Sequence, residues 1–413
     1  MRLLFFNRSF HPDVEATGQL LTELCEDLTA QGHDVTVVVG RPYNMDRFGS
    51  WWPVKREQLG RVRILRAYNP RLDKRFLIRR AVNLLTYFCF SFVAGFLARR
   101  ADVVVVLTDP PVLGLVAVFF ARLYRAKLIF SIKDVHPEIG VVLGKIKNRA
   151  MIKLLDVCTQ GTLARADRVA VLGEDMRRRV LARGYRHDDR IRVTPDWVDT
   201  TLVCPQPGSN AFRQQQGLDR LFVVMFSGNL GLSQGLDQVL DVAVSLRDRG
   251  DIRFVFIGEG AAKADLVERA RREGLQNVMF LPYQPKENLS ESLGAADVHL
   301  VTLRRGLAGL IVPSKVYGIM AVGGPFIAAV EECSDVARIV REENCGVRVE
   351  PDDPAQLAEA IRWAVRHPDE LRMMGQHGRQ AAVTRFDRRI AVTRFQTMLG
   401  ELAATERGRG RKA

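Results

Sequence analysis

The chain has 413 residues, with 61 Lys and Arg against 47 Asp and Glu, which gives a formal net charge of +14 at pH 7. This excess of positive charge favours anionic partners, such as phosphorylated substrates, anionic lipids or nucleic acid. The six cysteines form no CxxC pair and no Cys/His cluster, so the sequence indicates neither a metal site nor a disulfide framework. The opening run MRLLFF is strand-like and shows no signal-peptide pattern.

The first half of the chain alternates short β-branched runs with helical patterns. A helical period spans residues 20–30, and strands are predicted at 3–6, 35–39, 62–65, 103–108, 128–132, 168–171 and 191–193. Continuous apolar strands separated by helices are typical of a parallel sheet that is covered on both faces.

A second series follows the proline-containing stretch VCPQPGSN at residues 203–210, with strands predicted at 222–226, 254–257, 278–281, 298–303, 326–329 and 347–349. We therefore predict an α/β protein of two Rossmann-like, doubly wound, parallel-sheet domains that face each other across a cleft. The first domain is expected over residues 1–205 and the second over 206–387. A final helix, 388–403, is expected to pack back on the first domain, and the basic tail, 404–413, is expected to be disordered.

Ligands of doubly wound sheets bind beyond the carboxyl ends of the strands, and two loops of the first domain are candidates there. The first strand is followed by NRSFHPDVEATGQ, which contains His11, Thr17 and Gly18. Gly18, near a helix N-terminus, would admit a phosphate or a sugar to the backbone, or it merely shapes the turn.

The second loop, KDVHPEIG, places Asp134, His136 and Glu138 within five residues of one another. Such groups bind sugar hydroxyls or move protons, and the other interpretation is a solvated turn capped by Asp134. Their spacing matches no metal-binding motif.

The second domain carries glycine loops at the ends of two predicted strands, and a basic turn after a third. Gly228 and Asn229 follow the first strand, and Glu259 and Gly260 follow the second. The segment RRGLAGLIVPSKVYGIMAVGGPFIAA, residues 304–329, combines positive charge, a glycine-bearing turn and a helix start, a combination that suits a diphosphate. Its candidate ligands are Arg304, Arg305, Gly306, Ser314 and Lys315.

The segment 81–98, AVNLLTYFCFSFVAGFLA, has no charged residue and is flanked by arginines on both sides. Between residues 55 and 80 there are ten basic residues against two acidic ones. A helix of this kind inside an α/β series fits partial burial with one side on an anionic membrane, through the region Arg75–Arg100. The alternative is a core helix with a solvated basic flank.

Several motifs together resemble the retaining, family-4-like glycosyltransferases of the GT-B fold. The similarity runs over nearly the whole chain, and it is closest to the fucosaminyltransferase-like branch that builds bacterial surface polysaccharides. The motifs that carry it are FHPDVEATG, GHDVTVVV, DVHPE, FSGNLGLSQGLDQV, FIGEG, NVMFLPY and VPSKVYGIMAVGGP.

The resemblance implies transfer of a sugar from a nucleotide diphosphate sugar, with retention and without a metal or other cofactor. The expected donor is UDP-linked and carries an N-acetyl amino sugar. It implies a polyprenyl-diphosphate-linked or saccharide acceptor, as in O-antigen or capsule synthesis, and a peripheral location on the cytoplasmic face of the inner membrane. The diphosphate would be held by Gly228, Asn229, Gly306, Ser314 and Lys315.

The remaining candidates have other implied roles. Glu259 and Gly260 would lie near the base, while Asp134, His136 and Glu138 would face the donor sugar and the acceptor. With Lys315 they form the candidate catalytic set.

The chain departs from the family pattern at the residues that usually carry charge. Asn229 and Gln234 are neutral where relatives have an Arg and a Lys, and Leu310 and Gly318 stand near the two positions of a Glu-x7-Glu motif. The usual ribose contact therefore does not carry over, and Lys315 with the adjacent arginine pair is expected to supply the missing positive charge.

Two other functions fit parts of the sequence. A nucleotide-sugar epimerase shares the fold and the nucleotide-sugar site, but would have no use for a membrane-facing segment. A basic nucleic-acid-binding protein would account for the net charge alone, but the chain is only 8% aromatic and shows no nucleic-acid-binding motif, so no nucleic-acid partner is expected.

Overall fold

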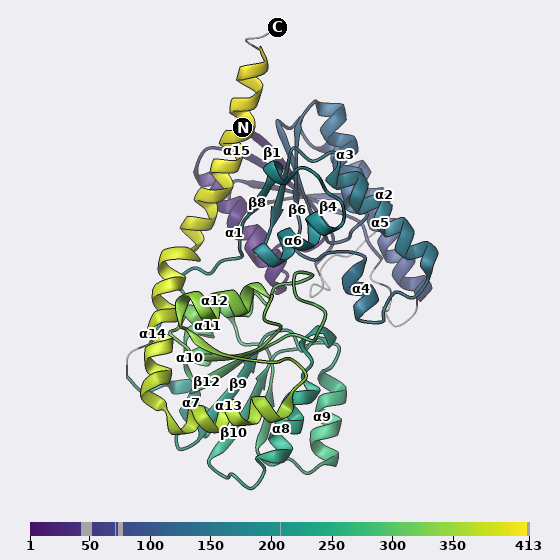
Figure 1. Cartoon of the computed structure of the whole chain (residues 1–413). Coiled ribbons are helices and arrows are strands. Elements are labelled where there is room, and N and C mark those ends of the chain that lie inside the picture. The colour runs from purple at the N-terminus through teal and green to yellow at the C-terminus, as the bar shows by residue number, and fades with distance from the viewer. Residues whose placement is uncertain (43–51, 71, 73–76, 207, 411–413) are drawn as a thin grey trace. The chain divides into compact units, whose positions relative to one another are not determined.

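The structure is a computed structural model, and it describes residues 1–42, 52–70, 72, 77–206 and 208–410 (Figure 1). Contacts divide the chain into two compact units. Unit 1 comprises Met1–Pro195 with Val392–Ala413, and unit 2 comprises Asp196–Ala391. Each unit has its own sheet.

The sheet of unit 1 has eight strands in the order β3-β4-β2-β1-β5-β6-β7-β8. The chain enters the sheet at its centre, where β1 pairs in parallel with both β2 and β5. Apolar side chains such as Phe5, Val37 and Val105 are buried on these central strands, as expected for strands covered on both faces. The strands are β1 (Arg2–Phe6), β2 (Asp34–Val39), β3 (Val54–Leu59), β4 (Val62–Ala67), β5 (Val103–Leu107), β6 (Lys127–Ser131), β7 (Arg168–Val171) and β8 (Ile191–Val193).

Strand β3 is absent from the sequence prediction, because VKREQL shows no apolar run. It forms an antiparallel hairpin with β4 at the sheet edge. Gly60, with φ of 54°, makes the tight connection between them. An edge strand exposed on one side needs few apolar residues, which explains why its pattern gave no signal.

Helices cover both faces of this sheet, with α2, α3 and α5 on one face and α1 and α15 on the other (Figure 1). Their bounds are α1 (Ala16–Ala30), α2 (Leu77–Leu97), α3 (Leu113–Tyr124), α4 (Glu138–Val142), α5 (Arg149–Leu163), α6 (Glu174–Ala182) and α15 (Arg388–Gly410). Among the described residues, no helix combines the length and the apolar character needed to cross a bilayer.

The sheet of unit 2 has six parallel strands in the order β11-β10-β9-β12-β13-β14. The strand order reverses between β9 and β12, and this switch point is where doubly wound sheets bind their ligands. The strands are β9 (Phe222–Ser227), β10 (Ile252–Ile257), β11 (Val278–Leu281), β12 (Val298–Thr302), β13 (Phe326–Ala329) and β14 (Gly346–Val349).

The helices of unit 2 pack their apolar faces on this sheet around a core that includes Phe226, Phe254 and Leu300. Their bounds are α7 (Ala211–Gln215), α8 (Asp237–Ser245), α9 (Lys263–Arg272), α10 (Leu289–Gly294), α11 (Lys315–Ala321), α12 (Asp335–Glu343), α13 (Pro354–Arg366) and α14 (Pro368–Arg385).

The structure divides the chain at 195/196, whereas the sequence analysis places the junction at 205/206. Residues 196–205 belong to unit 2 because hydrogen bonds tie them to it. Ser290 Oγ donates to the carbonyl of Leu202 at 2.9 Å and accepts from the N–H of Cys204 at 3.1 Å. Arg379 donates to the carbonyl of Val203 at 3.2 Å. A proline-rich composition therefore marked a packed loop rather than the boundary itself.

The final helix, α15, returns the chain to unit 1. Phe395 stacks on Phe5 of β1 with ring centroids 6.1 Å apart, and Glu401 accepts hydrogen bonds from Arg168 and Arg192. The helix continues to Gly410, into the tail for which disorder was expected, and residues 411–413 lie outside the described residues.

Candidate functional site

The loops after β9 and β10 are built on one another at the switch-point end of the unit 2 sheet. The N–H of Gly228 donates to the carbonyl of Ile257 at 2.9 Å, and the N–H of Leu230 donates to the carbonyl of Glu259 at 2.8 Å. Gly258 has a φ of 143°, and a Cβ atom there would lie 2.0 Å from the carbonyl oxygen of Gly228. Contact between the two loops thus requires glycine at position 258, so its presence does not by itself indicate a phosphate.

Lys315 is the first residue of α11, and its ammonium group lies beneath this pair of loops. Its Nζ atom lies 3.1 Å from the centroid of the Phe226 ring, at the end of β9. A Cβ atom built on Gly228 would come within 3.5 Å of the same nitrogen, which places the lysine directly beside the glycine loop. The structure therefore brings together two of the predicted diphosphate ligands, Lys315 and Gly228.

The Lys315 ammonium is buried, and it forms no hydrogen bond within the described part of the chain. Burial lowers the pKa of Lys315 well below its ordinary value of 10.5. An enclosed amine without a counterion is unfavourable in its charged form, so an anion that reached this point would relieve that penalty.

His299 on β12 supplies no negative charge to this lysine. Its Nε2 atom lies 3.0 Å from the carbonyl oxygen of Leu293. Burial lowers the pKa of His299 to about 4, the hydrogen bond to Leu293 opposes that shift, and the charge of Lys315 adds to it. His299 is thus a neutral neighbour of the Lys315 amine.

Arg304 and Arg305 lie in the loop after β12 and are held by carboxylates of their own unit. Arg304 pairs with Asp237 at 3.2 Å, and Arg305 pairs with Glu350 at 3.5 Å. All four side chains are at least one-third exposed, so these pairs are weak and exchangeable. Lys315 is therefore the one cation of the predicted diphosphate set that the structure buries.

Glu331, which the sequence analysis missed, occupies the backbone amides of the same loop. One of its carboxylate oxygens accepts hydrogen bonds from the N–H of Gly306 at 2.8 Å and of Ala308 at 3.2 Å. Glu331 follows β13, which pairs in parallel with β12, so topology rather than sequence proximity brings it to the loop. A side chain of the protein therefore occupies these two amides of the turn, and the diphosphate ligand remains a prediction.

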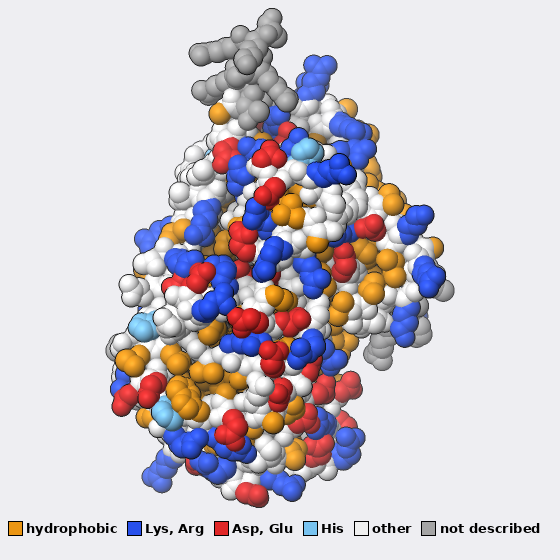
Figure 2. Space-filling view, in the orientation of Figure 1, with side chains coloured by type: hydrophobic (Ala, Val, Ile, Leu, Met, Phe, Trp, Pro, Cys, Tyr) orange, Lys and Arg blue, Asp and Glu red, His pale blue; other side chains and the backbone are white. Residues whose placement is uncertain are grey.

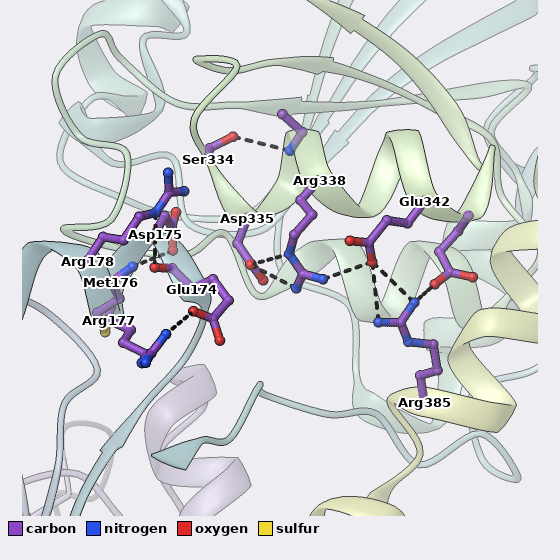
Figure 3. Close-up of polar contacts among 12 residues, drawn as sticks. Glu174, Asp175, Met176, Arg177, Arg178, Ser334, Asp335, Arg338, Glu342 and Arg385 are labelled. Carbon is purple, nitrogen blue, oxygen red and sulfur yellow. Dashed lines mark hydrogen bonds and ion pairs between the residues drawn. The ribbon is translucent and has the colours of Figure 1, made fainter. Parts of the chain in front are cut away.

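The loop that carries Glu331 is fixed by the start of α12 (Figure 3). Ser334 caps the helix, with its Oγ atom accepting from the N–H of Ala337 at 3.2 Å. Arg338 bridges Asp335 and Glu342, each at 2.9 Å, and Arg385 of α14 also bonds to Glu342 (Figure 3). These charges satisfy one another, which indicates a structural role.

The other predicted residues of unit 2 are less constrained. Ser314 immediately precedes α11, and its side chain forms no capping hydrogen bond. Glu259 is half-exposed and pairs with Lys263 at 2.6 Å. A Cβ atom on Gly260 would lie 2.6 Å from the Oδ1 atom of Asn229, so the Asn229 side-chain amide packs against that glycine.

In unit 1, the loop after β1 packs closely on the start of α1. A Cβ atom on Gly18 would lie 2.4 Å from Ser9 Oγ, so close packing explains this glycine. The N–H of His11 donates to Thr22 Oγ1 at 3.0 Å, and its carbonyl oxygen accepts from Arg66 at 2.6 Å. Thr17 is half-buried one residue before the glycine.

The loop after β6 gathers around Arg183. This arginine pairs with Glu138 at 2.9 Å and donates to the carbonyl oxygen of His136 at 2.9 Å. Burial lowers the pKa of His136, Asp109 acts in the opposite direction, and Arg183 adds to the lowering. The N–H of Asp134 donates to Thr108 Oγ1 at 3.1 Å. The structure thus keeps the three predicted residues of this loop together, with Glu138 already in an ion pair.

Within this cluster, His136 Nδ1 and Glu138 Oε2 are buried and form no hydrogen bond inside the described part of the chain. Buried polar atoms of this kind normally have a partner, so the pair suits a hydroxyl-bearing ligand or an ordered water. No three His, Cys, Asp or Glu side chains among the described residues are arranged to hold a metal ion.

Two protein families match the chain, one in each half. The family described as "Glycosyl transferase 4-like domain" matches residues 16–197, and "Glycosyl transferases group 1" matches residues 209–381. The putative colanic acid biosynthesis glycosyl transferase WcaI of Escherichia coli (strain K12) is 29% identical over 89% of this chain and 93% of its own. The probable glycosyltransferase WbjE of Pseudomonas aeruginosa is 32% identical over 71% of this chain and 73% of its own.

Two solved structures share the fold of this chain at low sequence identity. Sucrose-phosphate synthase from Thermosynechococcus elongatus aligns with a TM-score of 0.76 and 17% identity, over 98% of this chain and 100% of its own. Anabaena Alr3699/HepE in complex with UDP-glucose aligns with a TM-score of 0.73 and 16% identity, also over 98% of this chain and 100% of its own. At such identities the likeness establishes the fold alone, which is GT-B.

Proposed function

The chain belongs to the group 1 glycosyltransferases of the GT-B fold, and from this premise we propose that it transfers a sugar, with retention, from a nucleoside diphosphate sugar to a lipid-linked or saccharide acceptor. The observation that carries the proposal is Lys315, a buried amine without a hydrogen-bonding partner in the described part of the chain, at the switch point of the second sheet. A diphosphate is the ligand class that such a position suits.

Lys315 would act on the leaving group. When the bond between the sugar and the diphosphate breaks, negative charge grows on the departing phosphate oxygens. A fixed ammonium in a water-poor setting stabilises that charge more strongly than it stabilises the ground state, and this difference lowers the barrier. Arg304 and Arg305 would add charge from the surface by exchanging their present carboxylate partners for phosphate.

The proton of the acceptor hydroxyl would pass to the leaving phosphate itself. This route uses no side chain as general base and no metal ion, because Lys315 and backbone amides take the charge that a metal would otherwise take. In unit 1, the unpartnered polar atoms of His136 and Glu138 would bind hydroxyl groups of the sugars.

The donor is proposed to be UDP-linked and to carry an N-acetyl amino sugar. The UDP assignment draws support from the Anabaena structure solved with UDP-glucose, and the sugar assignment draws support from the fucosaminyltransferase-like motifs. The relative named for colanic acid biosynthesis supports a role in polysaccharide biosynthesis. The location proposed for this role is the cytoplasmic face of the membrane.

The test is a thermal-shift screen of the full chain against nucleotides and nucleotide sugars, because a ligand that binds only the native state raises the unfolding midpoint. We expect UDP and one UDP-sugar to raise the midpoint of the wild type, and the anomeric configuration of the product, measured by NMR, to be that of the donor. A donor that is isomerised in the absence of any acceptor would instead establish the epimerase alternative. The absence of a shift with every nucleotide would refute a nucleotide-sugar site.

A further inference from the structure

Three helices of unit 1 each expose a stripe of apolar side chains. The spacing is three or four residues, so each stripe lies along one side of its helix. On a solvated helix this outer side would be polar. The residues of this apolar face are Val82, Leu85, Cys89, Val93 and Phe96 on α2, Leu115, Phe119 and Leu123 on α3, and Met151, Leu154 and Val157 on α5.

The three stripes form one continuous surface because α3 packs between α2 and α5. Phe119 of α3 lies 5.8 Å from Phe96 of α2, measured between ring centroids. On the other side of α3, a Cβ atom on Gly114 would lie 2.2 Å from Thr162 Oγ1 of α5. Over the region labelled α2, α3 and α5 in Figure 1, Figure 2 shows orange apolar side chains interspersed with blue basic ones.

The opposite sides of the same helices are already used for packing. On α2, Tyr87 is only 1% exposed, whereas Leu85 and Phe96 are 64% and 60% exposed. The hydroxyl of Tyr87 donates to the carbonyl of Asn7 at 2.8 Å, at the end of β1. The apolar face is therefore an additional surface beyond what the fold needs, and contiguous apolar patches of this kind mark interaction sites.

Positive charge surrounds the apolar face. Between α4 and the first turns of α5, residues 139–155 contain four basic residues and no acidic one. The four, all exposed and without an ion pair in the described part of the chain, are Lys145, Lys147, Arg149 and Lys153. The acidic residues that bracket this run, Glu138 and Asp156, are both bound by Arg183. Arg99, Arg122 and Arg125 are also exposed, at the C-terminal ends of α2 and α3.

We propose that the apolar face docks flat on an anionic lipid bilayer, with its apolar side chains at the acyl boundary and the surrounding Lys and Arg side chains among the headgroups. The apolar stripes match the acyl region of such a surface, and the basic residues that border them match its anionic headgroups. A second copy of this chain fits less well, because the same excess of positive charge would meet itself across a twofold interface. The inference rests on the proposed function in one respect, which is that the enzyme would bind its lipid-linked acceptor at this membrane surface.

The proposal extends beyond the segment that the sequence indicated. Of the region Arg75–Arg100, residues 75 and 76 lie outside the described residues, and α2 supplies only part of the apolar face. The lysines before α5 and the stripe on α5 carry the rest. Tyr87, on the packed side of α2, donates to Asn7 in the loop after β1. That loop contains the predicted residue His11 and leads into the first turn of α1, where Thr17 and Gly18 lie, so it sits behind the docked helix.

The test is sedimentation of the full chain with vesicles of phosphatidylcholine alone or mixed equally with phosphatidylglycerol. We expect binding to the mixed vesicles only, and weaker binding at high salt. Lys145→Gln, Lys147→Gln and Lys153→Gln combined should weaken partitioning about a hundredfold, since each charge near an anionic surface contributes roughly a fivefold factor. The matched control removes three exposed arginines of unit 2, Arg220, Arg247 and Arg272, by the same change to Gln and should bind like the wild type.

The apolar contribution has its own variants. Leu154→Ser with Val157→Ser should weaken binding in a manner that added salt does not reproduce, whereas Val267→Ser with Met373→Ser, at exposed apolar positions of unit 2, should not. A polarity-sensitive dye on Cys89 should shift to the blue with anionic vesicles, and the same dye on the exposed Cys333 of unit 2 should not.

The outcomes are distinct. Equal binding of the lysine variant and the wild type would overturn the proposal, as would an unshifted dye on Cys89. A stable wild-type dimer that Phe96→Ser dissociates, without vesicle binding, would show instead that the apolar face joins two copies. UDP binding measured without lipid reports separately on the proposed function, and the docking variants should leave it unchanged.

Discussion

Replacement of Lys315 by Met should weaken nucleotide binding while it stabilises the empty protein. Met has nearly the same length and fills the space over the Phe226 ring, but it carries no charge. The two effects have opposite signs because the same ammonium is unfavourable when enclosed alone and favourable when a diphosphate joins it.

The magnitudes follow from the burial of the ammonium. A unit charge about 4 Å from another contributes about 4 kcal/mol at an effective dielectric constant of about 20, and a hydrogen bond to a charged group contributes about 1.5–3 kcal/mol. UDP affinity should therefore fall by roughly tenfold to a thousandfold, since about 1.4 kcal/mol is tenfold. Without ligand, the free energy of unfolding should rise by about 1–3 kcal/mol as the buried, unpartnered amine is removed.

The assay is UDP titration by calorimetry together with the unfolding midpoint, for the wild type, Lys315→Met and the control Lys286→Met, which makes the same change at an exposed lysine of unit 2. The control should match the wild type in both measurements. Undiminished UDP binding by Lys315→Met would refute the diphosphate assignment. If Lys315→Met had a lower unfolding midpoint than the wild type in the absence of ligand, the inference that burial of the Lys315 amine destabilises the protein would be refuted.

Three further changes test other parts of the structure. Gly258→Ala should destabilise the protein by about 3 kcal/mol or more, because its Cβ atom would meet a carbonyl oxygen at 2.0 Å with φ at 143°, whereas Gly250→Ala, where a Cβ meets nothing, should be nearly neutral in urea unfolding. Glu331→Ala should cost about 1–3 kcal/mol by removing the carboxylate that accepts from two loop amides, against a smaller loss for Glu332→Ala at an exposed ion pair; equal losses would show that the amides do not need this carboxylate. His299 stays neutral in the folded state down to about pH 4 but takes up a proton near its ordinary value of 6.5 when unfolded, so stability should fall as pH drops from 6.5 towards 4. His299→Gln should reduce that slope in unfolding midpoints measured across this range, and an unchanged slope would show that other groups cause it.

The sequence predicted the fold well because buried parallel strands have an unambiguous pattern. All thirteen strands expected from apolar runs are present, and the strand that was missed, β3, is a polar edge strand. The domain junction was displaced because Cys204 and its neighbours look like a linker in composition, while hydrogen bonds to Ser290 and Arg379 make them part of unit 2.

The candidate site was only partly predictable. Lys315 was identified from its place in a basic, glycine-bearing turn, but its burial without a partner depends on packing against Phe226 that no local pattern reveals. Glu331 was missed because it reaches the loop of Gly306 from a neighbouring strand. For Gly18 the sequence left two interpretations open, an opening for a ligand or a turn, and the structure explains this glycine by its close contact with Ser9.

The most direct test of the enclosed cation is the proton balance of UDP binding. Burial lowers the pKa of Lys315 in the empty protein, and a bound diphosphate should raise it again. Calorimetric titration in two buffers of different ionisation enthalpy, at a pH between that lowered pKa and 10.5, measures the protons taken up. We predict net proton uptake by the wild type and none by Lys315→Met. Tight UDP binding by the wild type without proton uptake would contradict the account.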